Sequence, residues 1–221
     1  MPDVRADFSR REVVDTHAEP WQPSPAAGVE RRLLDRIGDE LARATSIVRY
    51  APGSRFAAHD HALGEEFLVL EGVFEDEHGR YPAGTYVRNP PGTRHTPGAS
   101  EGCTIFVKLR QFPQDDLRAC VIDTHQLAWT EGPSAGVRQC VLHATAHETV
   151  TLLHFDAPAE PAPVRYPGGM ECLVLAGSLS DERGHYPVGC WLRLPPGSVQ
   201  QLRGTVGSRA WIKTGHLVDP A

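Results

Sequence analysis

Residues 65–92 read EEFLVLEGVFEDEHGRYPAGTYVRNPPG, and a related stretch, MECLVLAGSLSDERGHYPVGCWLRLPPG, follows at residues 170–197. The second stretch begins 105 residues after the first (170 − 65), and the shared Tyr-Pro pairs and Pro-Pro-Gly turns keep that offset. Further upstream, Asp15-Thr16-His17 returns as Asp123-Thr124-His125 with an offset of 108 (123 − 15). The simplest explanation is two copies of one structural unit.

Each copy is expected to consist of β-strands. Short apolar runs alternate with turns rich in glycine and proline, of which the chain has 21 and 19, and this pattern is typical of antiparallel barrels and sandwiches. The stretch GVERRLLDRIGDEL at 28–41 could form a helix, but its partner GVRQCVLHATAHETV at 136–150 is rich in β-branched residues. We therefore predict strand-loop-strand for both, and an all-β chain with units at 1–112 and 119–221.

Composition argues against several classes of partner. The formal net charge is −6, so the basic surface that draws proteins to nucleic acid is not expected. No window approaches the roughly 18 apolar residues that a membrane span needs, and the N-terminus is charged from its third residue, so we expect a cytoplasmic protein without membrane contact. The five cysteines include no C-x-x-C pair and are predicted to be free thiols without a role: Cys103, Cys120, Cys140, Cys172 and Cys190.

A candidate metal site lies just before the first repeat, in HDHALGEE at 59–66. Successive side chains of a strand point to opposite faces, so His59 and His61, two residues apart, are expected to face the same side, roughly 7 Å apart. The turn at Pro90-Pro91-Gly92 can bring His95 back toward them, and a glutamate can come from the next strand. Three imidazoles and a carboxylate suit a divalent first-row metal. The alternative is ordinary histidines without metal, since a lone H-x-H is a weak signal.

The repeat decides which glutamate joins the histidines. Glu66 is matched by Glu171, whereas Glu65 is matched by Met170. The three histidines are also not retained in the second copy: Val164, Tyr166 and Gln200 stand in place of His59, His61 and His95, and none of them offers an imidazole ligand. We therefore assign Glu65 to the metal and expect Glu66 and Glu171 to do a structural job in both copies, such as bonding to loop amides.

No catalytic group beyond the proposed ligands is identified. Five further side chains lie on strands that could line a barrel, but each is equally consistent with packing or surface: Tyr86, Arg88, Cys103, Phe106 and Lys108. His17 and His125 recur in both copies and are interpreted as architectural. The second copy is left with scaffolding, dimerisation or binding of a small apolar ligand.

These residues resemble the two cupin motifs. The first, G-x5-H-x-H-x3-E-x6-G, fits Gly53, His59, His61, Glu65 and Gly72, and the second, G-x5-P-x-G-x2-H, fits Gly84, Pro90, Gly92 and His95, with Ala99 where many cupins have asparagine. More narrowly, residues 64–109 closely resemble the cupin-like domain of ChrR, a zinc-binding anti-sigma factor, and the resemblance is strong over about 44–110 and extends through the repeat in weaker form to most of the chain. The resemblance implies two tandem jelly-roll barrels, with His59, His61, Glu65 and His95 as metal ligands in the first and a second barrel without metal.

The chain also departs from ChrR. The helical zinc domain that clasps the sigma factor carries an H-x3-C-x2-C pattern, and no cysteine precedes Cys103 here. We expect that domain to be missing, so any anti-sigma activity would depend on the barrel alone.

Three functions follow from these observations. The preferred one is a ChrR-like bicupin that serves as a regulatory or sensory protein, with one divalent ion per chain, zinc ahead of iron, nickel or manganese. A small ligand at the metal, a sigma factor or another protein, and a second copy of the chain are the partners expected. The first alternative is an iron dioxygenase of a small diketone or phenolic carbonyl compound, and the second is a structural metal in a binding scaffold.

Overall fold

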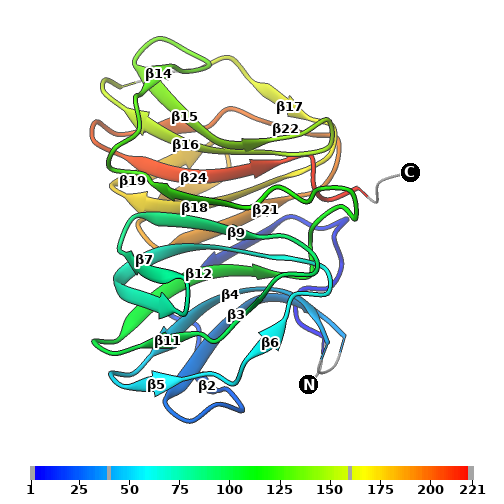
Figure 1. The fold of residues 1–221 in the computed structure, drawn as a ribbon. Helices are drawn as coiled ribbons and strands as arrows, with labels where there is room; N and C mark the ends of the chain where they lie inside the picture. Colours follow the sequence, from blue (N-terminus) through cyan, green and yellow to red (C-terminus); the bar gives the residue numbers. More distant parts are fainter. Residues whose placement is uncertain (1–2, 39–40, 159–160, 219–221) are drawn as a thin grey trace. The chain divides into compact units, whose positions relative to one another are not determined.

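A computed structural model describes residues 3–38, 41–158 and 161–218, and every regular element in them is a β-strand (Figure 1). Their contacts form two compact units. The first unit consists of Met1–Ala6 and Glu19–Gln126, and the second of Asp7–Ala18 and Leu127–Ala221. The all-β prediction is confirmed.

The first unit is built around one antiparallel sheet with two smaller sets of strands. Its central path runs in the order β13-β9-β7-β12-β4-β3-β2. The strands β5, β8 and β11 extend this sheet, and β10 pairs with β6 separately. The bounds are β2 Gln22–Pro23, β3 Val29–Ile37, β4 Arg43–Tyr50, β5 Ser54–Arg55, β6 His59–Asp60, β7 Glu65–Asp76, β8 Gly79–Pro82, β9 Thr85–Asn89, β10 Arg94–His95, β11 Gly98–Ala99, β12 Cys103–Leu109 and β13 Cys120–Asp123.

The second unit repeats this plan. Its central path, β1-β21-β18-β24-β16-β15-β14, matches that of the first unit strand for strand, and β17 with β22 and β20 with β19 and β23 form the smaller sheets. The bounds are β1 Glu12–Asp15, β14 Thr130–Glu131, β15 Val137–Ala144, β16 Thr149–Phe155, β17 Val164–Tyr166, β18 Met170–Ala176, β19 Ser178–Asp181, β20 Gly184–Pro187, β21 Cys190–Leu194, β22 Ser198–Gln200, β23 Arg203–Gly204 and β24 Arg209–Thr214.

Each unit takes its edge strand from a segment that the repeat assigns to the other copy. β13 pairs with β9 in the first unit, and β1 pairs with β21 in the second. At the end of β13 the hydroxyl of Thr124 donates to the carbonyl oxygen of Gly84 at 2.6 Å, and His125 lies against the same glycine. The limits 1–112 and 119–221 stay a prediction; the structural units differ from them by these two exchanged segments.

Each unit contains a buried apolar cluster. In the first unit Phe67 and Val69 of β7 join a buried cluster with Phe74, Tyr81 and residues of β9 and β12. Phe67 and Val69 lie on the face of β7 that also carries Glu65, as the alternation of side chains along a strand predicts. The equivalent cluster of the second unit contains Met170, Cys172 and Val174 of β18. Both units therefore have an apolar core, although only the first contains the three histidines.

Two further expectations are met. Residues 28–41 and 136–150 contain β3 and β15 rather than helices, although Asp39 and Glu40 lie outside the described residues. All five cysteines are free, and four of them are buried. Nowhere in the described part of the chain is there a helix that could cross a membrane.

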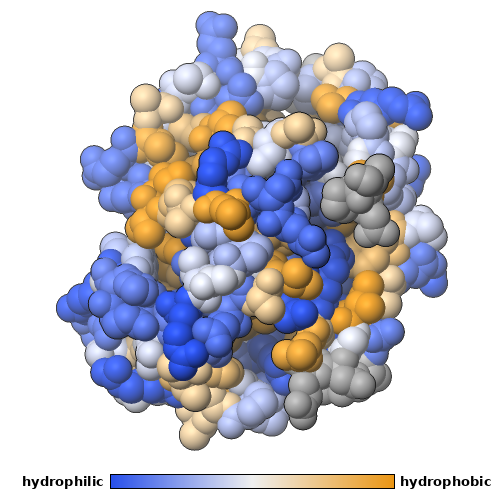
Figure 2. Space-filling view, turned by 45° about the vertical axis from the view of Figure 1, so that its right-hand side comes forward, coloured by the Kyte–Doolittle hydropathy of each residue, from blue (hydrophilic) through white to orange (hydrophobic). Residues whose placement is uncertain are grey.

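Hydrophobic residues at the surface are interspersed with hydrophilic ones on the face drawn in Figure 2. Exposed apolar side chains include Leu117 and Val121 in the first unit and Val141 and Val206 in the second. Scattered exposed apolar residues of this kind are normal for a folded protein and indicate no particular partner.

Two glycines of the first cupin motif allow a matched stability test. Gly53 and Gly72 have positive φ angles of 78° and 70°, but an added Cβ meets nothing within 4 Å at Gly53 and lies 2.1 Å from the Gly102 carbonyl oxygen at Gly72. We expect Gly53→Ala to lower the free energy of unfolding by about 1 kcal/mol and Gly72→Ala by about 3 kcal/mol or more. Urea unfolding measures both; equal losses would contradict the close approach at Gly72.

Candidate metal centre

Four side chains of the first unit converge as the sequence predicts. One donor atom each from His59, His61, Glu65 and His95 lies within 4.8 Å of the others. Register explains part of this, because β10 places His95 directly opposite His59 in β6. The turn before β10 has Gly92 at a φ of 86°, as the third residue of a type II turn requires.

The imidazole rings face one another closely. Their centroids are 5.1 Å apart for His59 and His61, 5.0 Å for His59 and His95, and 4.5 Å for His61 and His95. Three rings at these distances, with no hydrogen bond between them, resemble the ligands of a common ion more than a packed aromatic cluster. His61 and His95 are buried and His59 is partly exposed, so the cluster opens toward solvent on the His59 side.

The Nδ1 atoms are occupied by neighbouring oxygens. His61 Nδ1 lies 2.9 Å from the Thr93 hydroxyl, and His95 Nδ1 lies 3.1 Å from Asp76 Oδ2. His59 Nδ1 is 3.1 Å from the carbonyl oxygen of Ala57. Such partners fix ring orientation and tautomer in metal sites, leaving Nε2 as the coordinating atom.

The Nε2 atoms are where a metal fits. Those of His61 and His95 are buried and have no hydrogen-bond partner. They lie 3.6 and 3.5 Å from the same oxygen, Oε1 of Glu65. Two ligands bound at about 2.1 Å to one ion would be roughly 3.0–3.4 Å apart at octahedral or tetrahedral angles. The donor set therefore fits a divalent metal after a small contraction.

The pKa values of the two buried imidazoles, His61 and His95, shift in opposite directions. Burial lowers the pKa of His61, and this outweighs the nearby Glu65 charge. Burial would also lower the pKa of His95, but the hydrogen bond to Asp76 and the charge of Glu65 raise it. Burial opposes ionisation of Asp76 as well, yet hydrogen bonds from His95, the His78 amide and Tyr81 lower its pKa. Asp76 is thus an ionised anchor that makes His95 more basic.

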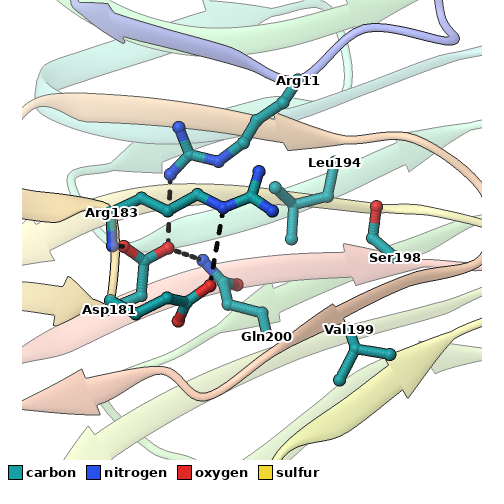
Figure 3. A pocket seen from close by; sticks show the side chains of 8 residues that line it. Arg11, Asp181, Arg183, Leu194, Ser198, Val199 and Gln200 are labelled. Carbon is teal, nitrogen blue, oxygen red and sulfur yellow. Dashed lines mark hydrogen bonds and ion pairs between the residues drawn. The ribbon is translucent and has the colours of Figure 1, made fainter.

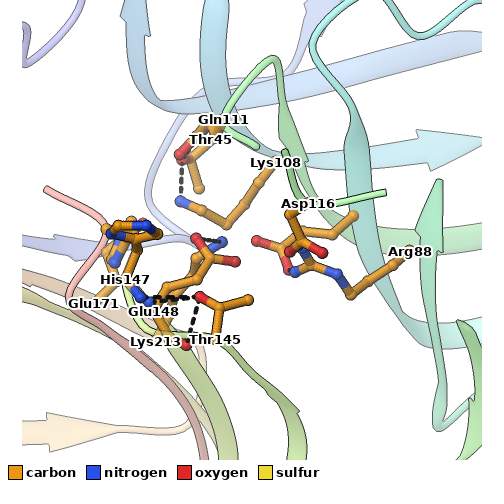
Figure 4. A network of polar contacts seen from close by, with 12 residues as sticks. Thr45, Arg88, Lys108, Gln111, Asp116, Thr145, His147, Glu148, Glu171 and Lys213 are labelled. Atoms are coloured by element: carbon orange, nitrogen blue, oxygen red, sulfur yellow. Dashed lines mark hydrogen bonds and ion pairs between the residues drawn. The ribbon is translucent and has the colours of Figure 1, made fainter. Parts of the chain in front are cut away.

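Glu66 lies on the opposite face of β7 and takes part in a different network. The Tyr86 hydroxyl donates to Glu66 Oε2 at 2.5 Å and Arg88 Nη1 donates to the same atom at 2.9 Å. The other end of the Arg88 guanidinium donates to Asp116 at 2.7 Å. Figure 4 shows the neighbouring Lys108, whose ammonium group donates to the Thr45 hydroxyl at 2.9 Å. All these groups are buried.

Glu171 has the corresponding role in the second unit. It accepts a hydrogen bond of 2.9 Å from the indole of Trp191, which is the counterpart of Tyr86, and lies 2.5 Å from His216 Nε2. Near it, Lys213 forms a buried ion pair of 3.0 Å with Glu148 (Figure 4). A structural role for both glutamates was expected, with loop amides as an example of the partners; the hydrogen bonds described above are to side chains, and no sequence pattern marks His216.

The other residues singled out from the sequence divide between two environments. Cys103 belongs to the apolar cluster inside the first unit, where burial raises the pKa of its thiol to about 12. Tyr86, Arg88 and Lys108 instead belong to the buried polar network around Glu66. Asp76, Thr93 and Asn89 support the cluster but were not predicted, because only contacts distant in sequence reveal them. Asn89 donates to Glu65 Oε1 at 3.2 Å.

Comparisons with known proteins identify the family of the chain. A family model described as the ChrR cupin-like domain matches residues 9–113 and again 117–218. No curated protein matches the chain in sequence.

Solved structures show the same fold at low identity. A putative dioxygenase from Nostoc punctiforme is 16% identical, with a TM-score of 0.78 over 96% of this chain and 85% of that one. A bacterial pirin, YhhW from Escherichia coli, solved with nickel(II), is 13% identical, with a TM-score of 0.67 over 95% of this chain and all of that one (100%). Oxalate decarboxylase from Bacillus subtilis is 12% identical, with a TM-score of 0.63 over 93% and 77%.

The two adjacent glutamates provide the first test of the site. We expect Glu65→Gln to remove most bound metal, because a carboxylate ligand is lost, and Glu66→Gln to keep it. The second variant should instead lower the free energy of unfolding by about 2 kcal/mol, since Arg88 loses a buried charged partner. Elemental analysis and urea unfolding measure the two effects. Equal metal loss in both variants would show that the assignment is wrong.

Asp76 provides a second test, with Asp181 as its control. An amide at position 76 would oppose the Nδ1 hydrogen of His95 and favour the tautomer that blocks Nε2, so Asp76→Asn should weaken metal binding by about 10- to 100-fold. Asp181 holds the equivalent place in the second unit, where it accepts a hydrogen bond from Gln200. Asp181→Asn should therefore leave metal affinity unchanged. Competition titration with a metal indicator measures both, and similar affinities for the two variants would refute the role given to Asp76.

Proposed function

The chain belongs to the ChrR cupin-like domain family, and from this we propose that it is a metal-binding regulatory or sensory bicupin with one divalent ion in its first barrel. The ion would be held by Nε2 of His59, His61 and His95 and by the carboxylate of Glu65. One observation carries the proposal: two buried imidazole nitrogens without a partner face one carboxylate oxygen. Leaving such groups unsatisfied is costly, and a metal ion removes the cost.

The chemistry of the bound ion follows from the donor set. Four protein ligands leave one or two positions on a five- or six-coordinate ion for a small ligand or an oxidant. The partly exposed His59 marks the solvent side of the cluster. The ring centroids of Phe74 and His95 are 6.0 Å apart, and Phe74 belongs to the apolar core. We propose that a small molecule reaches the ion from the His59 side.

The proposal of a sensory protein also names a metal ion and candidate partners. Zinc is the preferred ion, with iron, nickel or manganese as alternatives, and the crystallised pirin was solved with nickel(II). A sigma factor or another protein would receive the signal, and a second copy of the chain is a further proposed partner. Nucleic acid is not proposed, given the net charge of −6.

A second candidate function is an iron-dependent dioxygenase of a small diketone or phenolic carbonyl compound. The fold similarity to the putative dioxygenase of Nostoc punctiforme supports this candidate. The same four ligands and open positions would serve it, because dioxygen and a chelating substrate need adjacent coordination sites. The chain's own residues would hold the ion, keep His95 oriented through Asp76 and surround the site with apolar side chains.

Elemental analysis of anaerobically purified protein, combined with an oxygen-uptake screen, separates the candidates. We expect close to one zinc per chain and no oxygen consumption with diketones or catechols. Iron with substrate-dependent oxygen uptake would favour the dioxygenase. A chain in which His59→Ala and His61→Ala are combined is the control and should lose the metal. Two ions per chain, or metal retained by this control, would contradict the proposal.

Metal removal tests whether the ion is structural. Both units are filled by apolar clusters, so we expect the far-ultraviolet circular dichroism spectrum to persist after chelation at neutral pH. Binding only to the folded state should still raise the melting temperature of the metal-loaded protein. Cooperative unfolding of the chain on chelation would instead support a structural metal.

A further inference from the structure

The second unit contains a small cavity beside Gln200, the counterpart of His95 (Figure 3). Its volume is about 70 Å³. Four of its lining residues are the counterparts, at the offset of 105, of the residues that form or support the metal site: Asp181 for Asp76, Leu194 for Asn89, Ser198 for Thr93 and Gln200 for His95. Register agrees, because Gln200 pairs with Val164 as His95 pairs with His59. The cavity therefore lies beside the counterparts of the supporting residues, and the counterparts of His59, His61 and Glu65, which are Val164, Tyr166 and Met170, do not line it.

The side-chain amide of Gln200 has a hydrogen-bond partner at its nitrogen but none at its oxygen. Its amide nitrogen donates to Asp181 Oδ2 at 2.7 Å, as His95 Nδ1 contacts Asp76 in the first unit. Its amide oxygen is buried and has no hydrogen-bond partner, and the residue is only 3% exposed. A buried acceptor lowers stability unless a donor reaches it. Gln200 lines the cavity, and a ligand bound there with an O–H or N–H group would supply that donor.

Arg11 adds a cation that the first unit lacks. It precedes β1, and its Nη2 lies 3.2 Å from Asp181 Oδ2. The structure shows no hydrogen bond from its Nε or Nη1 within the described residues, and the side chain keeps 21% exposure. At the upstream offset of 108 its counterpart is Ala119. Arg11 and Arg183 thus both line the cavity, and the counterpart of Arg183 in the first unit is His78.

The negative charge of Asp181 is already well compensated. Its Oδ1 accepts hydrogen bonds from the amides of Arg183 and Gly184, at 2.7 and 2.9 Å, and from the Tyr186 hydroxyl. Its Oδ2 accepts from Gln200 and faces Arg11. Burial opposes ionisation of Asp181, yet these hydrogen bonds lower its pKa. The unused donors of Arg11 are therefore available to another anion.

We propose that this cavity binds a small hydroxycarboxylate such as lactate or glycolate. The planar guanidinium of Arg11 suits a carboxylate, which can accept two parallel hydrogen bonds from it. The hydroxyl group of the ligand donates to Gln200 Oε1, and Leu194 covers its short carbon chain. A volume of about 70 Å³ admits only a few water-sized groups. The lining is polar and charged, and besides Arg11 and Asp181 it contains Glu182 and Arg183, which lie 3.6 Å apart as an ion pair.

Calorimetric titration of the metal-free full-length chain tests the proposal. Metal must be removed because hydroxycarboxylates also chelate metal ions, so the result is independent of the first barrel. We expect lactate to bind with a Kd of about 1 mM or below and propionate, which lacks the hydroxyl, to bind about tenfold more weakly. Arg11→Ala and Gln200→Leu should each weaken lactate binding by about tenfold or more. Arg138→Ala is the control, since it removes an exposed ion pair with Asp156 in the same unit.

Two results would overturn the proposal. One is the absence of heat from lactate and glycolate at concentrations of about 20 mM, well above the expected Kd. The other is unchanged lactate affinity in both cavity variants. Should Arg11→Ala fail to fold, Arg11→Lys keeps a cation beside Asp181 but lacks the planar fork, and it must show weakened binding. Failure here leaves the metal proposal intact, because that proposal depends on metal content alone.

Discussion

The first barrel buries two imidazole nitrogens that have no hydrogen-bond partner, and this constraint organises the site around them. A buried polar atom without a partner costs about 1–3 kcal/mol, so the Nε2 atoms of His61 and His95 would destabilise the barrel unless something binds there. Their Nδ1 atoms are already engaged by Thr93 and Asp76. The rings cannot turn to use the other nitrogen without losing those contacts. A metal ion beside Glu65 satisfies both nitrogens together.

The second barrel shows what happens when the ligands are lost but their support remains. Asp181 keeps the amide and hydroxyl contacts that Asp76 has, and it orients Gln200 as Asp76 orients His95. Glutamine preserves the donor that the aspartate requires and replaces the coordinating nitrogen with an amide oxygen. The supporting residues thus have the same contacts in both barrels, and the two barrels differ in the atoms that face the site. The second barrel keeps its apolar core without the histidines.

Much of this arrangement could be predicted from the sequence. The repeat predicted two units, and the spacing of His59 and His61 with the turn at Gly92 predicted that three histidines lie together, as the structure shows. Comparison of the copies separated Glu65 from Glu66, and their different networks agree with that separation. Each of these signals is local or depends on a fixed offset. The ChrR cupin-like resemblance was likewise carried by motifs with fixed spacing.

Other features could not be found this way, because they depend on contacts between distant segments. Arg11 reaches Asp181 across 170 positions of sequence, and nothing in its own neighbourhood marks it. The exchanged strands β1 and β13 have the same sequence pattern whichever sheet they join. The hydrogen bond between His216 and Glu171 gave no signal either.

A crystal structure with anomalous diffraction data from the metal-loaded protein tests the central claim most directly. We predict one anomalous peak per chain, about 2.0–2.2 Å from Nε2 of His59, His61 and His95 and from a carboxylate oxygen of Glu65. A peak coordinated through Nδ1, a peak at Gln200, or no peak in the first barrel would contradict the account.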